Sequence, residues 1–280
     1  TPLRRHTHSM GQGTTPHTAE ASEVEGLNYF WVLSGKRIKQ IAVLVVALFF
    51  AAGIFYAEKK NIQVFLPVET GPEAIYSVNT DKKQVALTFD ISWGEERAGP
   101  ILDVLEQKGL KKATFFLSSP WAESHPDIVK RIVDMNYEIG SHGHRHDNYS
   151  TYSEQKIREQ ISKADHILTK LTGKKPNLIR FPNGDFDKRV LRIADSLGYT
   201  TIQWDTDSLD WMNPGKDKIV QRVVSKAHPG DIILMHASDS CRQTHEALPE
   251  IIDKLRDKGY EFVTVSELIA GAKVKTNPVE

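Results

Sequence analysis

The sequence predicts an α/β fold in which about seven strand–helix units form a parallel barrel or an open doubly wound sheet. Short apolar runs without polar alternation recur along the chain, as expected for parallel strands that are covered on both faces. Amphipathic stretches with helical spacing lie between these runs. Glycine follows three of the stretches, at Gly109, Gly198 and Gly259, where a left-handed helix cap leads into the next strand.

Each expected element follows from one of these patterns. The expected strands are, in chain order, 85–89, 113–117, 137–141, 178–180, 199–202, 232–235 and 260–264. The expected helices have one apolar face and include 101–105, 128–133, 157–171 and 248–255. Reactive groups of such folds gather at the C-terminal ends of the strands. The polar residues that follow each strand are therefore the candidates for a functional site.

The chain divides into five expected segments. Residues 1–27 have no apolar period and are expected to be a disordered leader. Residues 28–57 are expected to be a cytoplasmic stub and a membrane anchor or signal, and 58–82 a polar linker or peripheral hairpin. Residues 83–272 are expected to form the globular domain, with a tail at 273–280.

The apolar run 41–57 carries no charge and follows the cations Lys36, Arg37 and Lys39. As a helix it would rise about 25 Å, slightly less than the ~30 Å hydrocarbon core of a bilayer. Cations before the run favour a cytoplasmic N-terminus. A cleaved signal peptide is the alternative, with small residues at 51–53 as its cleavage site. Both interpretations predict an extracytoplasmic globular domain, membrane-anchored or secreted.

The composition is that of a globular protein, since 40% of the 280 residues are hydrophobic and 26% are charged. Lys+Arg and Asp+Glu number 36 each, and the formal net charge is zero. This balance argues against a generic nucleic-acid binder, which needs a basic surplus to contact phosphates. The single cysteine, Cys241, excludes an internal disulfide and a cysteine-rich zinc site.

Polar side chains follow five of the expected strands at similar depth. They are Asp90, the segments 142–147, 180–184 and 205–211, and His236. Because parallel strands end at the same edge of a sheet or barrel, we expect these groups to share one cavity.

The five segments resemble the motifs of the polysaccharide deacetylases of carbohydrate esterase family four. The matching motifs are TFD at 88–90, HxxxH at 142–146, RxPxG at 180–184, DW at 210–211 and LxH at 234–236. The resemblance extends over about 83–269 and is strongest to sporulation-type deacetylases of spore-forming bacteria. It implies a deformed parallel (β/α)7-8 barrel of the NodB type, here preceded by the expected membrane segment. It also implies a hydrolase that removes N-acetyl groups from an extracellular glycan such as peptidoglycan of the cell or spore wall.

The same resemblance implies roles for the catalytic residues. Asp90 would be the general base, and Arg180 would orient it. His142 and His146 would bind a divalent metal ion, usually zinc, and two imidazoles four residues apart can face one ion. His236 would donate a proton to the leaving amine.

Four further residues are assigned in the same way. Asp210 would pair with His236 and raise its pKa. The backbone N–H of Asn183 would bind the oxyanion, while Trp211 and Leu234 would line the pocket for the acetyl group.

One residue departs from the family pattern. Active members usually have a second aspartate after TFD, which completes the metal site, whereas this chain has Ile91. An isoleucine cannot bind a cation, so a site with two histidines would hold zinc more weakly. Another nearby ligand, a weakly held ion and a metal-free site are all compatible with the sequence. The alternatives to a deacetylase are a catalytically impaired glycan-binding protein on the same fold and a metal-independent amidase.

Overall fold

The computed structural model describes residues 34–59, 71–271 and 273–276, so the predicted leader at 1–27 lies outside the described residues. The chain divides into two compact units, Thr1–Leu66 and Pro67–Glu280. The described part of the first unit consists of helix α1 (Gly35–Lys59). The candidate site lies in the second unit.

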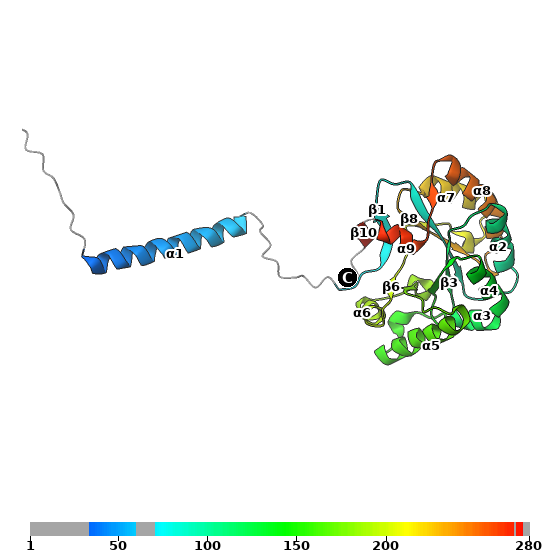
Figure 1. Cartoon of the computed structure of the whole chain (residues 1–280), viewed down its shortest axis with the longest axis horizontal. Coiled ribbons are helices and arrows are strands. Elements are labelled where there is room, and N and C mark those ends of the chain that lie inside the picture. The colour runs from blue at the N-terminus through cyan, green and yellow to red at the C-terminus, as the bar shows by residue number, and fades with distance from the viewer. Residues whose placement is uncertain (1–33, 60–70, 272, 277–280) are drawn as a thin grey trace, which may run out of the picture. The chain divides into compact units, whose positions relative to one another are not determined.

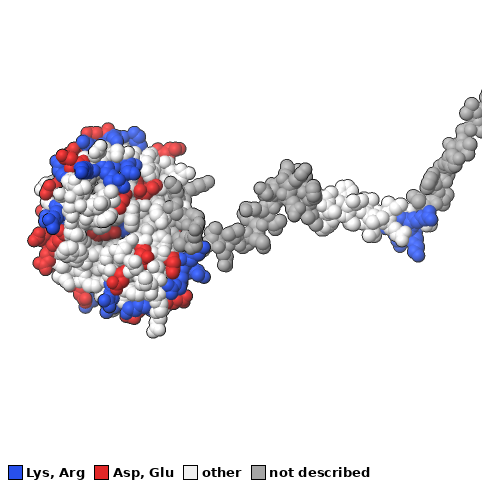
Figure 2. Space-filling model, turned by 180° about the vertical axis from the view of Figure 1, so that it is seen from behind, with Lys and Arg blue, Asp and Glu red and all other residues white. Residues whose placement is uncertain are grey.

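Helix α1 covers the apolar run 41–57 that the sequence predicts to be a membrane segment. Its first turns carry the cations Lys36, Arg37 and Lys39, which form the blue group at one end of this helix in Figure 2. Among the helices that the structure describes, none combines the length and the apolar character needed to cross a membrane. The structure thus does not support the predicted membrane segment.

The second unit is built on one sheet with ten strands in the described residues. They are β1 (Ile75–Asn79), β2 (Gln84–Ile91), β3 (Thr114–Leu117), β4 (Glu138–Ser141), β5 (Leu178–Ile179), β6 (Thr200–Thr201), β7 (Thr206–Asp207), β8 (Asp231–His236), β9 (Glu261–Phe262) and β10 (Lys273–Thr276). The order is β10-β1-β8-β2-β3-β4-β5-β6, with β7 paired to β8 and β9 paired to β2. Ile202, directly after β6, forms a parallel bridge with Ile75 of β1. This bridge nearly closes the sheet into a barrel.

Helices cover the outside of this sheet (Figure 1). They are α2 (Ala98–Gln107), α3 (Ser119–Ser124), α4 (Pro126–Asp134), α5 (Glu154–Thr172), α6 (Lys188–Ser196), α7 (Lys216–Lys226), α8 (Thr244–Asp257) and α9 (Val265–Ala270). Short 3₁₀ helices occur at η1 (Tyr149–Thr151), η2 (Pro182–Gly184) and η3 (Asp210–Met212). On the face of this unit seen in Figure 2, basic and acidic side chains are interspersed.

The predicted α/β class is confirmed, and each of the seven predicted strands overlaps an observed strand. Three short strands were not predicted. Strand β1 lies within the expected linker 58–82 and pairs antiparallel with β8 and β10, while β10 lies within the expected tail 273–280. These two segments thus contribute to the sheet. The third, β7, has only two residues and is too short to show a periodic pattern.

The alternation of side chains along β2 decides which residues reach the barrel interior. Leu87, Phe89 and Ile91 belong to the apolar cluster that packs against α2 and α8. The side chains between them, including Asp90, therefore point to the opposite face of the sheet. The parallel register of β2 with β8 pairs Asp90 with His236. Strand pairing alone thus brings two residues 146 positions apart side by side.

Candidate active site

A cavity of about 570 Å³ opens at the C-terminal ends of the strands. It is lined by Asp90, Ser92, Trp93, His142, His146, Asn183, Gly184, Trp204, Asp207, Trp211, Leu234, His236, Ser238 and Ser240. Seven of the nine residues predicted for the site line this cavity. The other two, Arg180 and Asp210, are buried and contact the lining residues. The structure thus brings together all nine predicted site residues.

The Asp90 carboxylate is fixed by a buried arginine. Arg180 Nη1 donates a hydrogen bond to Asp90 Oδ1 at 2.8 Å and a second to Thr88 Oγ1 at 2.8 Å, while Nη2 donates to the Gln203 carbonyl oxygen. Its guanidinium also stacks over the Phe116 ring, 4.3 Å from the centroid. Burial raises the pKa of Asp90, but the positive charge of Arg180 lowers it, and the net pKa lies below the usual range. Asp90 is therefore an ionised carboxylate at neutral pH.

The two predicted metal ligands lie side by side, with ring centroids 5.5 Å apart. His142 Nδ1 lies 2.8 Å from the Arg180 carbonyl oxygen, and because a carbonyl can only accept, Nδ1 carries the proton. The other nitrogen, Nε2, is left with a lone pair and lies 3.9 Å from Asp90 Oδ2. Burial lowers the pKa of His142 to about 4 and lowers that of His146 as well. Both rings are therefore neutral, as metal ligands must be.

This donor set fits a divalent metal ion in part. An imidazole whose Nδ1–H is held by a carbonyl, with Nε2 free, is the usual form of a zinc-binding histidine. Ile91 supplies no third ligand, and its fully buried side chain lies in the apolar cluster on the outer face of β2. In the described residues, Asp90, His142 and His146 are not among the groups of three whose donor atoms converge within 4.8 Å. The protein thus offers two imidazoles to an ion, and the remaining ligands would come from elsewhere.

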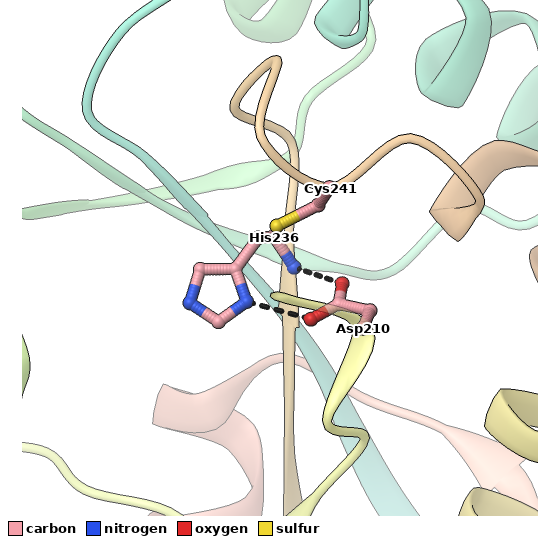
Figure 3. Close-up of side chains that lie close together, drawn as sticks. All are labelled: Asp210, His236 and Cys241. Atoms are coloured by element: carbon pink, nitrogen blue, oxygen red, sulfur yellow. Dashed lines mark hydrogen bonds and ion pairs between the residues drawn. The ribbon is translucent and has the colours of Figure 1, made fainter. Parts of the chain in front are cut away.

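A second histidine–carboxylate pair is formed by His236 at the end of β8 and Asp210 in η3 (Figure 3). His236 Nδ1 lies 2.7 Å from Asp210 Oδ1, and the His236 backbone N–H donates to Asp210 Oδ2 at 2.8 Å. Thr244 Oγ1 also donates to Asp210 Oδ2, at 2.7 Å. Burial lowers the pKa of His236, but the Asp210 carboxylate raises it more strongly, and the net pKa is raised. This pair favours the protonated imidazole and so suits an acid.

The Cys241 thiol lies close to this pair, and the possible ligand atoms of Asp210, His236 and Cys241 all lie within 4.8 Å of one another. Both Asp210 oxygens already accept hydrogen bonds from His236 and Thr244. The Cys241 side chain is buried, which raises the pKa of its thiol to about 12 and keeps it protonated. In Figure 3 the sulfur lies beside the main chain of His236, and the imidazole ring extends away from it. These features indicate that the Cys241 thiol packs beside the hydrogen-bonded pair of His236 and Asp210, and that the three residues do not form a metal site.

The three residues predicted to contact substrate come from three separate segments. Asn183 lies in η2 with a φ of 58°, a left-handed conformation that its neighbour Gly184 shares. Trp211 lies in η3, and its side chain is 50% exposed. Leu234 is buried on β8. All three line the cavity, although with no substrate present their roles stay predictions.

Seven lining residues are not among the nine predicted for the site. Five of them, Ser92, Trp93, Trp204, Ser238 and Ser240, follow strand ends by one to four positions. Extending the rule about strand ends by a few residues would have found them. The other two, Gly184 and Asp207, lie within the candidate segments 180–184 and 205–211. The Asp207 carboxylate accepts hydrogen bonds from the Leu209 backbone N–H and from the Trp211 indole.

Comparisons with known proteins agree with this geometry. Residues 77–202 match the family model described as polysaccharide deacetylase. The chain is 37% identical over 195 residues to a peptidoglycan-N-acetylglucosamine deacetylase of Bacillus cereus, covering 69% of this chain and 70% of that protein. It is also 37% identical over 198 residues to the Bacillus subtilis protein YlxY, covering 71% of this chain but only 61% of that relative's length.

Solved structures resemble the globular unit as well. A wild-type pseudoenzyme of the CE4 family from Bacillus anthracis is 38% identical, with a TM-score of 0.68 over 74% of this chain and 73% of its own. A mutant of that pseudoenzyme with restored enzymatic activity is 40% identical, with a TM-score of 0.67 over 71% of this chain and 72% of its own. The structures that resemble this chain thus include proteins with and without activity.

Proposed function

Because this chain belongs to the polysaccharide deacetylase family, we propose that it hydrolyses N-acetyl groups on a glycan outside the cytoplasm, namely peptidoglycan of a bacterial cell or spore wall. One observation carries the proposal. An ionised carboxylate, Asp90, and an imidazole with a raised pKa, His236, are neighbours on paired strands and line one cavity. A base and an acid with opposite pKa shifts are the two groups that amide hydrolysis needs.

Asp90 is the proposed base. Its ionised carboxylate accepts a proton from the water whose oxygen attacks the acetyl carbonyl carbon. Arg180 holds Oδ1 in place through its hydrogen bond, so Oδ2 is the oxygen available to the water. Oδ2 also lies on the side of the two histidines, 3.9 Å from His142 Nε2.

His142 and His146 would hold a divalent metal ion such as zinc, which when bound would polarise the acetyl carbonyl and lower the pKa of water. Their own contribution is independent of its identity. The hydrogen bond from His142 Nδ1 to the Arg180 carbonyl fixes the ring, and both rings stay neutral at neutral pH. The same arginine thus orients the proposed base and one proposed ligand.

His236 is the proposed acid. When the carbon–nitrogen bond breaks, the protonated imidazole gives a proton to the leaving nitrogen, and the products are acetate and a sugar with a free amine. Asp210 stabilises the protonated ring and fixes its orientation. Trp211 and Leu234 would pack against the acetyl methyl group, and the Asn183 backbone N–H would stabilise the oxyanion.

The substrate class rests on the relatives. Proteins named as peptidoglycan deacetylases of Bacillus cereus and Bacillus subtilis are 37% and 32% identical to this chain. Peptidoglycan lies outside the cytoplasmic membrane, so we infer that this chain also acts there. Acetate release measured side by side on vegetative and on spore-wall peptidoglycan shows which of the two is the better substrate.

Acetate release from N-acetylated peptidoglycan by the full chain, with a chelator or with added zinc, tests the proposal. We expect Asp90→Asn and His236→Gln each to lower the rate by about 10²–10⁴-fold. His166→Gln and Asp257→Asn are matched controls, because both side chains are exposed on outer helices. Full activity in Asp90→Asn or His236→Gln would reject the assigned roles.

A glycan-binding protein without catalysis is the second candidate. It is favoured by Ile91, which offers no third metal ligand, and by the similarity to the Bacillus anthracis pseudoenzyme. This candidate predicts that the parent chain binds peptidoglycan but releases no acetate at any zinc concentration. Acetate release that depends on Asp90 would exclude it.

A further inference from the structure

Trp93 lies in the loop between β2 and α2, and its side chain is 55% exposed. It lines the same cavity as Asp90 and His236. Full burial of a large apolar side chain stabilises a folded protein. The fold leaves this gain unused at a position next to the proposed base.

The backbone beneath this exposed ring is held firmly. The Ser92 N–H donates to Ser238 Oγ at 2.9 Å, which ties the loop to the segment that follows β8. The Asp239 carboxylate accepts three backbone N–H groups of the same loop, from Glu95, Glu96 and Arg97, at 2.9, 2.9 and 3.0 Å.

Gly94 permits this close approach of the two loops. It has a φ of +99°, and a Cβ atom at this position would lie 2.2 Å from Asp239 Cγ. Its carbonyl oxygen accepts a hydrogen bond from the Trp121 indole at 2.8 Å. Trp93 is therefore an exposed indole on a fixed backbone, the arrangement that loses least entropy when a ligand binds.

A second exposed indole lines the cavity from a different element. Trp211 in η3 is 50% exposed, and Asp207 holds its Nε1. Aromatic faces pack against the C–H faces of pyranose rings, while hydroxyl and carboxylate groups such as Ser92 and Asp207 bind sugar hydroxyls. Two such faces, together with a cavity of about 570 Å³, provide more contact surface than one acetamido sugar needs.

We propose that Trp93 forms a subsite for the pyranose ring adjacent to the one that carries the reacting acetyl group. The gain in affinity for a chain over a single sugar then depends on the Trp93 ring. This inference rests on the proposed function, because it takes Asp90 and His236 as the reacting centre. Trp93 thereby contributes to substrate length specificity and takes no part in proton transfer.

Calorimetric titration of full-length Asp90→Asn protein with N-acetylglucosamine and with its β-1,4-linked tetramer tests the inference. Adding Trp93→Ala should weaken tetramer binding about tenfold and leave binding of the monosaccharide unchanged. Trp93→Phe, which keeps an aromatic face, should restore most of the tetramer affinity. Met212→Ala is the matched control, since Met212 is 59% exposed but does not line the cavity.

Equal tetramer affinity with and without the Trp93 ring would overturn the inference, as would an equal loss of tetramer and monosaccharide binding. The proposed function is tested separately by acetate release. Acetate release by a Trp93→Ala protein with parental kcat/KM on the tetramer would reject the subsite and leave the deacetylase proposal standing. Absence of both acetate release and tetramer binding in the parent chain would reject both.

Discussion

The Asp210→Asn substitution tests the proposed role of His236 as the acid, because it keeps the shape of the side chain and removes its charge. Asp210 accepts three hydrogen bonds, from the His236 backbone N–H, from Thr244 Oγ1 and from His236 Nδ1. An asparagine whose carbonyl oxygen replaces Oδ2 still accepts the first two. Its amide N–H₂ then faces His236 Nδ1, which must become an acceptor and lose its proton.

The expected consequences for stability and for catalysis are therefore of different size. Since each of the buried donors keeps a partner, the free energy of unfolding should change by about 1 kcal/mol or less. The imidazole, however, loses the carboxylate that raises its pKa, so a smaller fraction of His236 is protonated and able to act as the acid. We expect kcat to fall by about 10²–10⁴-fold, the usual contribution of a general acid.

The pH profile distinguishes this effect from general damage. Activity that needs protonated His236 is lost as pH rises through its raised pKa. In the Asp210→Asn protein that pKa is lower, so the basic limb of the profile of kcat/KM should move to lower pH. Asp210→Ala is the contrasting variant, since it leaves the His236 N–H and the Thr244 hydroxyl without an acceptor and should cost about 1–3 kcal/mol. A basic limb unmoved in Asp210→Asn, with a rate within threefold of the parent, would refute the reasoning.

Three further predictions concern Arg180, Ile91 and His142. Arg180→Gln removes the charge that lowers the pKa of Asp90, so the acidic limb of the activity profile should move to higher pH in a kinetic titration. Ile91→Asp places a carboxylate in an apolar cluster and should cost at least about 2 kcal/mol in chemical denaturation, whereas Ile91→Val should cost about 0.5–1.5 kcal/mol; parental stability together with a newly bound equivalent of zinc would contradict this. Because burial lowers the pKa of His142 to about 4, the unfolded chain binds more protons than the folded one between about pH 6.5 and 4. The free energy of unfolding should therefore decrease as pH falls through this window, less steeply in His142→Asn than in His166→Gln, and equal slopes in urea titrations would count against the assignment.

The fold was largely predictable because its strands are continuous apolar runs. Strands covered on both faces, such as β2 and β8, are nearly uniform in hydrophobicity and stand out from the polar loops. Strand β1 escaped prediction because it contains Tyr76, Ser77 and Asn79, and its pairing with β8 and β10 depends on partners far along the chain. Such edge pairing leaves little local signal in a sequence.

The site was predictable to the extent that strand ends determine it. The register of β2 with β8 places Asp90 beside His236, and a reader of the sequence can infer this from the order of the strands. The hydrogen bonds of Asp239 to the loop after β2 could not be inferred, since they depend on the conformation of two loops. The exposed Trp93 that this loop carries was missed for the same reason.

The alternation along β2 also shows that Ile91 has a structural role in the apolar core in addition to leaving the metal site without a third ligand. Adjacent residues of a strand point to opposite faces, so the geometry that directs Asp90 into the cavity directs Ile91 into the apolar layer under α2 and α8. A carboxylate at position 91, the last residue of β2, would start from this apolar face and would have to turn around the end of the strand to approach the two histidines. In this chain β2 continues through Ile91, which pairs with Leu117 of β3. Because the family pattern places an aspartate at this position, zinc binding by Ile91→Asp tests whether the end of β2 can turn that carboxylate toward His142 and His146, and its stability measures what the change costs the apolar layer.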